Sequence, residues 1–150
     1  WLVGPRQVGR SAVCVWRDVL TPNLDRLALW PFDGTLTELV AARRPIVAEM
    51  YPAFLLRTLG AAVTRKPDPA ARAACGRAVL RGARADGRVD LDAVAGLLRD
   101  GFGPSSAGED AFDATIACVA LAKLFLDGAV PEPPAEPRRV EGWILGLGAS

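Results

Sequence analysis

The chain of 150 residues is long enough to bury the core of one domain, and its 51% hydrophobic and 23% charged residues are typical of a soluble globular protein. No apolar run could span a bilayer and no signal peptide is visible, so we expect a cytoplasmic protein without a membrane partner. There is no His, and the three cysteines Cys14, Cys75 and Cys118 are scattered, which argues against zinc sites and His-based triads. The net charge is +1, but residues 65–88 carry seven basic and two acidic side chains, a local charge of +5 that suggests a polyanionic partner.

The first third of the chain predicts short elements. We expect an irregular or helical entry over residues 1–26, with a helix over 11–20 that ends before Pro22. A strand is expected over 27–32. A helix should begin after Thr35, where Glu38 completes a capping box, and run to about Arg43. The run 45–50 is typical of a buried parallel strand.

The remainder of the chain favours helices. Pro52 is well placed to start one that ends before Gly60. Another should begin at Asp68 or Pro69 and end near Gly82, and a third should cover 90–100. Ser106 and Glu109 form a second capping box, which predicts a long helix to about Asp127. A Pro-rich connector over 129–139 then leads to a final strand within 140–147.

The long helix carries the first candidate site residues. At 100° per residue, Asp110 lies in the sector of Ala117, Leu121 and Leu124, with Asp113 at its edge. Carboxylates beside a packing face require a partner, and a divalent cation is one. Glu109 is explained as a helix cap, whereas Asp113 lies too far into the helix for that role. The alternative is that the pair is purely structural.

Glu49 is the second candidate, because it follows an apolar strand near its carboxyl end, where open α/β sheets bind ligands. The alternative is a strand-end charge that points to solvent. Three carboxylates without His suit hard cations such as Mg²⁺ or Mn²⁺.

Basic residues supply the third candidate. Arg77, Arg81, Arg84 and Arg88 would share one face of a continuous helix, although Gly82 and Gly87 argue against continuity. This stripe is either a solvated face or a contact for phosphate backbones. Lys66 is a candidate phosphate or carboxylate contact, with a plain loop lysine as the alternative.

Several segments, in order and spacing, resemble the predicted nucleases of the domain of unknown function 429 family. They extend from about Leu27 onward and are Leu29-Trp30-Pro31-Phe32-Asp33, Val47-Ala48-Glu49-Met50-Tyr51-Pro52-Ala53, Lys66 through Arg72, Gly108-Glu109-Asp110-Ala111-Phe112-Asp113-Ala114 and Glu141-Gly142-Trp143-Ile144.

The resemblance implies an α/β, ribonuclease H-like fold, with a sheet flanked by helices and an acidic site similar to that of RuvC-type resolvases. It assigns catalysis and Mg²⁺ or Mn²⁺ binding to Glu49, Asp110 and Asp113, and phosphate binding to Lys66 and Arg72. The implied activity is two-metal hydrolysis of phosphodiesters in DNA or RNA.

One departure concerns the first strand of that fold, which normally carries a central Asp. Here Asp18 and Asp25 both lie in helix-like sequence. We therefore expect 1–150 to be a single, partial domain, a C-terminal fragment without the first strands, and inactive by itself. An opened sheet exposes an edge, which favours homo-oligomers. The alternatives are a non-catalytic nucleic-acid or protein-binding module of the same fold, or a small-molecule phosphohydrolase. No glycine-rich phosphate loop of the P-loop type is present.

Overall fold

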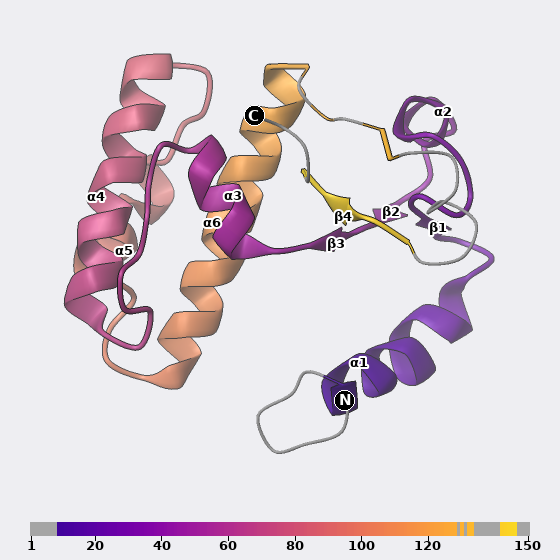
Figure 1. Cartoon of the computed structure of the whole chain (residues 1–150), viewed down its shortest axis with the longest axis horizontal. Helices are drawn as coiled ribbons and strands as arrows, with labels where there is room; N and C mark the ends of the chain where they lie inside the picture. Colours follow the sequence, from indigo (N-terminus) through magenta and orange to yellow (C-terminus); the bar gives the residue numbers. More distant parts are fainter. Residues whose placement is uncertain (1–8, 129, 131, 134–141, 147–150) are drawn as a thin grey trace. The chain divides into compact units, whose positions relative to one another are not determined.

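A computed structural model describes residues 9–128, 130, 132–133 and 142–146, which mix helices with short strands (Figure 1). The elements are α1 (Gly9–Val15), a π-helical turn η1 (Trp16–Leu20), a 3-10 turn η2 (Thr21–Asn23), β1 (Ala28–Leu29), α2 (Leu36–Ala41), β2 (Ile46–Val47), β3 (Glu49–Met50), α3 (Pro52–Thr58), α4 (Pro69–Asp86), a 3-10 turn η3 (Asp92–Val94), α5 (Ala95–Asp100), α6 (Ser106–Leu126) and β4 (Ile144–Leu145).

The chain forms two compact units, and the division between them falls inside β3. The first unit comprises 1–49 and 132–143, and the second comprises 50–131 and 144–150. Strands β1 and β2 pair in parallel, with Ala28 opposite Ile46 and Leu29 opposite Val47, and β3 pairs with β4 in another two-stranded sheet. The broad expectation of helices with a parallel strand pair is therefore confirmed.

The expected strands are shorter than the sequence suggested. In the 27–32 run only β1 is extended, because the chain turns directly after it and the Asp33 carboxylate accepts a 2.7 Å hydrogen bond from the Leu29 amide. The 45–50 run is divided into β2 and β3, and both residues of β2 are only half-buried. The prediction of one buried strand over 45–50 is thus wrong in both length and burial.

Helix α2 confirms the first capping box. The Thr35 hydroxyl accepts from the Glu38 amide, while the Glu38 carboxylate accepts from the Thr35 amide at 2.8 Å. The carboxylate of Glu132 accepts a 2.7 Å bond from the Leu36 amide, which binds the later segment to the first turn of α2. A short helix of six residues is stabilised by these two carboxylates at its positive end.

The second unit is helical and contains the larger core. Helices α4 and α5 pack together, as do α3 and α6. The main cluster places Phe112 and Ile116 of α6 against Val79 of α4 and Leu98 of α5, all almost fully buried. A smaller cluster joins α3 to the later turns of α6, and it contains Leu55, Ala120 and Leu124.

Two helix boundaries in this unit differ from the expected ones. Helix α4 begins as expected, with Asp68 as its cap, but it continues through Gly82 to Asp86. Gly87, in the left-handed conformation, ends it instead. Helix α6 starts one residue earlier than predicted, because Ser105 rather than Ser106 accepts from the Gly108 amide. Glu109 therefore falls one position too late for a capping box.

None of the helices in the described part of the chain combines the length and the apolar character needed to cross a lipid bilayer. Of the expected connector 129–139, only residues 130, 132 and 133 are described. The final strand is present as β4.

Candidate metal and phosphate site

Asp113 and Lys66 form an ion pair in the helical unit. Asp113 lies in the second turn of α6, and its carboxylate accepts a hydrogen bond from the Nζ of Lys66 in the loop before α4. The Asp113 side chain is 25% exposed and that of Lys66 is 40% exposed, so the pair lies at the border between core and solvent. Lys66 is thus more than a plain loop lysine, and the carboxylate has a cationic partner.

Asp110 occupies a different environment from the one predicted. Its side chain is exposed, one turn before Asp113 on α6. The expected packing of its sector is supplied by α3, which contacts Ala117, Ala120 and Leu124 further along the helix. The first turns of α6 bury the side of Gly108 and Phe112 instead. The helical wheel correctly placed Asp110 on the side of α6 that packs on α3. It did not show that α3 contacts only the later turns of α6 and leaves Asp110 exposed.

Arg72 lies inside the helical unit and is bound by its backbone. It is fully buried, and its guanidinium donates to three carbonyls, those of Gly101 at 2.8 Å, Lys66 at 2.7 Å and Gly103. Backbone carbonyls of the same unit therefore already bind the guanidinium that the resemblance assigned to phosphate binding. A sequence signal existed, because Arg72 lies on the same helical face as Gly76 and Val79, which are buried.

The contact to Lys66 gives Arg72 a position in the candidate site. One Arg72 nitrogen binds the backbone of Lys66, whose side chain in turn binds Asp113. The chain of contacts from Arg72 through Lys66 to Asp113 therefore connects the beginning of α4 to the second turn of α6. Nothing in the sequence pattern predicts a pair 47 residues apart.

Glu49, the remaining candidate ligand, is exposed at the start of β3 and belongs to the first unit. Its assignment to the same site as Asp110 and Asp113 stays a prediction.

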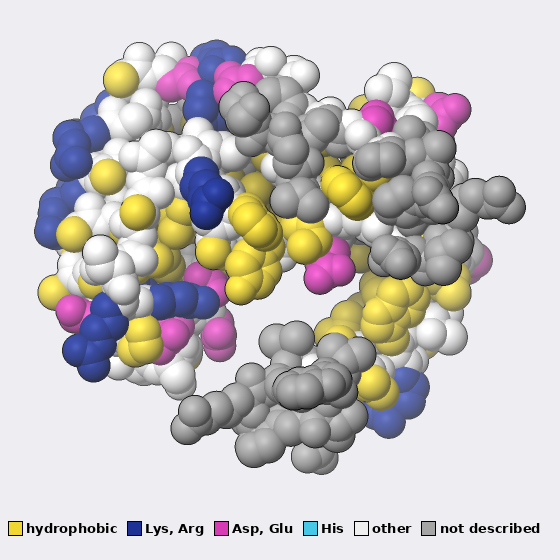
Figure 2. Space-filling model, viewed as in Figure 1, with side chains coloured by type: hydrophobic (Ala, Val, Ile, Leu, Met, Phe, Trp, Pro, Cys, Tyr) yellow, Lys and Arg dark blue, Asp and Glu magenta, His cyan; other side chains and the backbone are white. Residues whose placement is uncertain are grey.

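The basic stripe is divided by the structure. Because α4 is continuous, Arg77, Arg81 and Arg84 occupy one exposed face, and Figure 2 shows basic side chains (dark blue) along this helix. Arg77 makes a long contact of 3.4 Å to the Arg99 carbonyl, and none of the three forms an ion pair with another described residue. Gly82 does not interrupt the helix, so these three arginines share one face as the spacing predicted.

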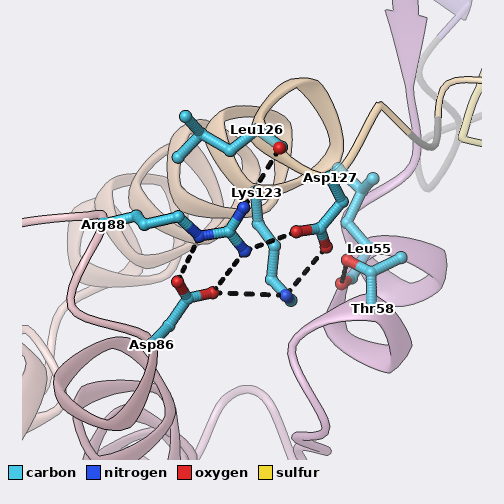
Figure 3. Close-up of polar contacts among 7 residues, drawn as sticks. All are labelled: Leu55, Thr58, Asp86, Arg88, Lys123, Leu126 and Asp127. Carbon is cyan, nitrogen blue, oxygen red and sulfur yellow. Dashed lines mark hydrogen bonds and ion pairs between the residues drawn. The ribbon is translucent and has the colours of Figure 1, made fainter.

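Arg88 lies beyond the end of α4 and belongs to a separate network of charges (Figure 3). Its guanidinium binds the carboxylates of Asp86 and Asp127 and donates to the Leu126 carbonyl at 3.0 Å. Lys123 binds Asp127 at 2.8 Å and Asp86 at 3.4 Å. The network joins the C-terminal ends of α4 and α6, so Arg88 is not part of the exposed stripe.

The charges in this network shift one another's ionisation. The hydrogen bond from Arg88 is the main cause that lowers the pKa of Asp86 to about 2, and Lys123 contributes. The pKa of Asp127 is lowered chiefly by Lys123. Conversely, the pKa of Arg88 is raised mainly by Asp86 and that of Lys123 mainly by Asp127. All four groups remain charged at neutral pH, so their ion pairs link the two helix ends.

The donor set for a metal ion can be tested on these residues. Asp110 and Asp113 offer carboxylate oxygens three residues apart on one helix, the donor type that Mg²⁺ and Mn²⁺ prefer. Within the described residues, no three acidic or thiol side chains gather into a group that could hold a metal ion. The helical unit thus supplies two ligands of the right chemistry, one of which binds Lys66.

Comparison of the chain with known protein families, curated proteins and solved structures finds no match.

Proposed function

We propose that this chain carries part of a metal-dependent site for phosphodiester hydrolysis in nucleic acid, in a domain of the ribonuclease H-like class. The observation that carries the proposal is the Lys66–Asp113 pair at the border of the core, with Asp110 exposed one turn away. The resemblance to the domain of unknown function 429 family supports it, because the same motifs contain these residues. The resemblance alone adds Glu49 to the set.

In this proposal Asp110 and Asp113 hold a divalent cation, and Lys66 has two roles. A bound Mg²⁺ or Mn²⁺ would activate water and stabilise the leaving oxygen. Without it, the Lys66 ammonium neutralises the Asp113 carboxylate. When the carboxylate is used for a cation, Lys66 is free to contact a phosphate oxygen as a point charge. Arg72 acts as a positioning residue, because it binds the Lys66 backbone and has no direct access to substrate.

The α4 face of Arg77, Arg81 and Arg84 supports nucleic acid as the substrate class. Three exposed guanidinium groups on one helix face offer positive charge for contacts with a phosphate backbone. The same observation favours a second function, a module that binds nucleic acid without cleaving it.

Calorimetric titration with Mn²⁺ tests the metal site. We expect the full chain to bind Mn²⁺ and Asp113→Asn to weaken this binding by about tenfold or more, since a neutral amide replaces a charged ligand. Asp100→Asn, an exposed acid on α5, is the matched control and should leave affinity unchanged. No heat of Mn²⁺ binding, or equal affinity in both variants, would refute the site.

Fluorescence anisotropy with a labelled oligonucleotide separates the two functions. Replacing Arg77, Arg81 and Arg84 with Gln should reduce the salt dependence of binding by roughly 2–3 counterions. Cleavage with Mn²⁺ that is lost in Asp113→Asn supports the nuclease. A salt-dependent affinity without cleavage at any divalent cation concentration supports the binding module.

A further inference from the structure

The first unit contains an open cavity of about 490 Å³ that is rich in aromatic side chains. Trp16, Trp30, Phe32 and Trp143 line it, so three of the four tryptophans of the chain surround one space. A cavity of this size falls in the range of small-ligand sites. No sequence pattern predicts this cavity, because its aromatic residues are scattered over α1–η1, the segment after β1 and the segment before β4.

Two of the aromatic side chains, Trp16 and Phe32, are about half exposed to solvent. Trp16 is 48% exposed and Phe32 is 49% exposed, although both rings would contribute large apolar areas to a core. The Phe32 ring lies against Gly142, where an added Cβ would be only 3.2 Å from the ring. Glycine at this position, at φ +75, therefore allows the ring to approach the backbone beside Trp143. Figure 2 shows hydrophobic side chains exposed along the α1–η1 segment as well.

One charged group defines which aromatic ligand would fit. Glu49 is the one charged side chain among the described residues that line the cavity, and its carboxylate is a hydrogen-bond acceptor. Trp30 is 3% exposed, and its buried indole N–H has no acceptor among the described residues. A fitting ligand therefore has a flat apolar face and N–H donors for Glu49.

We infer that this cavity binds an unpaired nucleobase, with guanine as the favoured base. A nucleobase has a π-face that stacks on tryptophan and an edge that combines donors and acceptors. Guanine presents two adjacent N–H donors, which one carboxylate can accept together, and it also carries carbonyl and ring-nitrogen acceptors. The sugar and phosphate stay at the mouth, away from the negative charge of Glu49. The inference rests on the proposed function in that it names single-stranded nucleic acid as the substrate class, and it assigns Glu49 to the base instead of to the metal ion.

A simple organic cation is the other ligand that aromatic rings and one carboxylate attract. A quaternary cation has no N–H donor for the Glu49 carboxylate and no flat face to stack between the rings, so these two features favour the base. Tetramethylammonium is therefore included in the test as a competing ligand.

The experiment is calorimetric titration of the full chain with guanosine in EDTA, so that the outcome is independent of any metal site. We expect guanosine to bind more tightly than uridine, which has one N–H donor on its base. Trp16→Ala should weaken guanosine by about tenfold, since it removes one stacking surface. Glu49→Gln should reduce the preference for guanosine over uridine. Phe125→Ala, an equally exposed aromatic of α6 outside the cavity, is the control and should change nothing.

A second titration identifies the source of the base. A ten-nucleotide single strand with a central guanine should bind better than the same sequence in a duplex if the base comes from a nucleic acid strand. Tighter binding of free guanosine than of the strand would overturn the substrate class. Absence of guanosine binding, equal affinity in Trp16→Ala, or selective binding of tetramethylammonium would overturn the nucleobase site. Mn²⁺-dependent cleavage without guanosine binding would refute this inference alone, whereas guanosine binding without cleavage would refute the proposed hydrolysis alone.

Discussion

Replacing Arg72 with Met tests the role of the buried guanidinium. Met retains much of the aliphatic side chain, so the change removes mainly the charge and its donors. The three carbonyls that Arg72 binds lie in two loops, at Lys66 before α4 and at Gly101 and Gly103 after α5. The substitution should therefore loosen both loops at once.

The cost can be estimated from these contacts. The bond to Gly101 is buried, and an unsatisfied buried carbonyl costs about 1–3 kcal/mol. The bonds to Lys66 and Gly103 are partly buried, so water can replace some of them, at about 0.5–1.5 kcal/mol each. Removing a desolvated charge offsets part of the loss. The net expectation is a decrease of about 2–4 kcal/mol in the free energy of unfolding, or roughly 5–15 °C in Tm.

Urea unfolding followed by circular dichroism measures this change, with Arg77→Met as the matched control on the same helix. Arg77 is exposed and makes one long contact, so its replacement should change the free energy of unfolding by no more than about 0.5 kcal/mol. Arg72→Met should also affect Mn²⁺ binding less than Asp113→Asn does, because it removes no metal ligand and acts only through Lys66. A loss below about 1 kcal/mol, or equal effects of the two Met variants, would refute the structural role of Arg72.

Two further predictions concern α4 and its end. Gly76→Ala should destabilise the helical unit by about 1–3 kcal/mol in urea unfolding, because the new Cβ would lie 2.1 Å from the Leu98 carbonyl oxygen. Gly82→Ala places its Cβ at an ordinary contact distance, so it should stabilise α4 by about 0.5–1 kcal/mol. A destabilising effect of Gly82→Ala would contradict this reasoning. Because the pKa of Asp86 falls from 3.8 to about 2 on folding, its stabilising contribution is complete above about pH 4 and is lost as the pH falls toward 2. Asp86→Asn should therefore make the decline of the free energy of unfolding from pH 4 to pH 2 shallower, and parallel curves for the two proteins would show that the network does not supply it.

The sequence predicted elements where the determining contacts are local. The Thr35–Glu38 box, Pro52 at the first position of α3 and Asp68 before α4 all act within four residues, and each appears as predicted. The second box failed by one residue, because two consecutive serines, Ser105 and Ser106, offer alternative caps and local rules do not choose between them.

The strands and the continuity of α4 depend on distant contacts instead. Gly82 is a poor helix residue, but packing of α4 on α5 continues the helix past it, so propensity is overridden by burial elsewhere on the helix. The apolar run over 45–50 had the composition of a buried strand. Nothing within it shows that its neighbour β1 pairs at only two residues.

The candidate site shows the same limit more sharply. Periodicity placed Asp110 and Asp113 on neighbouring faces of a helix, yet a wheel specifies direction and not what lies there. The environment of Asp113 depends on Lys66, whose loop is held by Arg72, and Arg72 depends on carbonyls about 30 residues away along the chain. Each of these contacts joins a helix to a loop, and no local sequence pattern predicts it. Because Asp113 is held through this chain of contacts while Asp110 is free of packing, a cation would find one positioned ligand and one adaptable ligand on α6. Of the two aspartates, Asp113 is therefore the one whose replacement should cost more affinity.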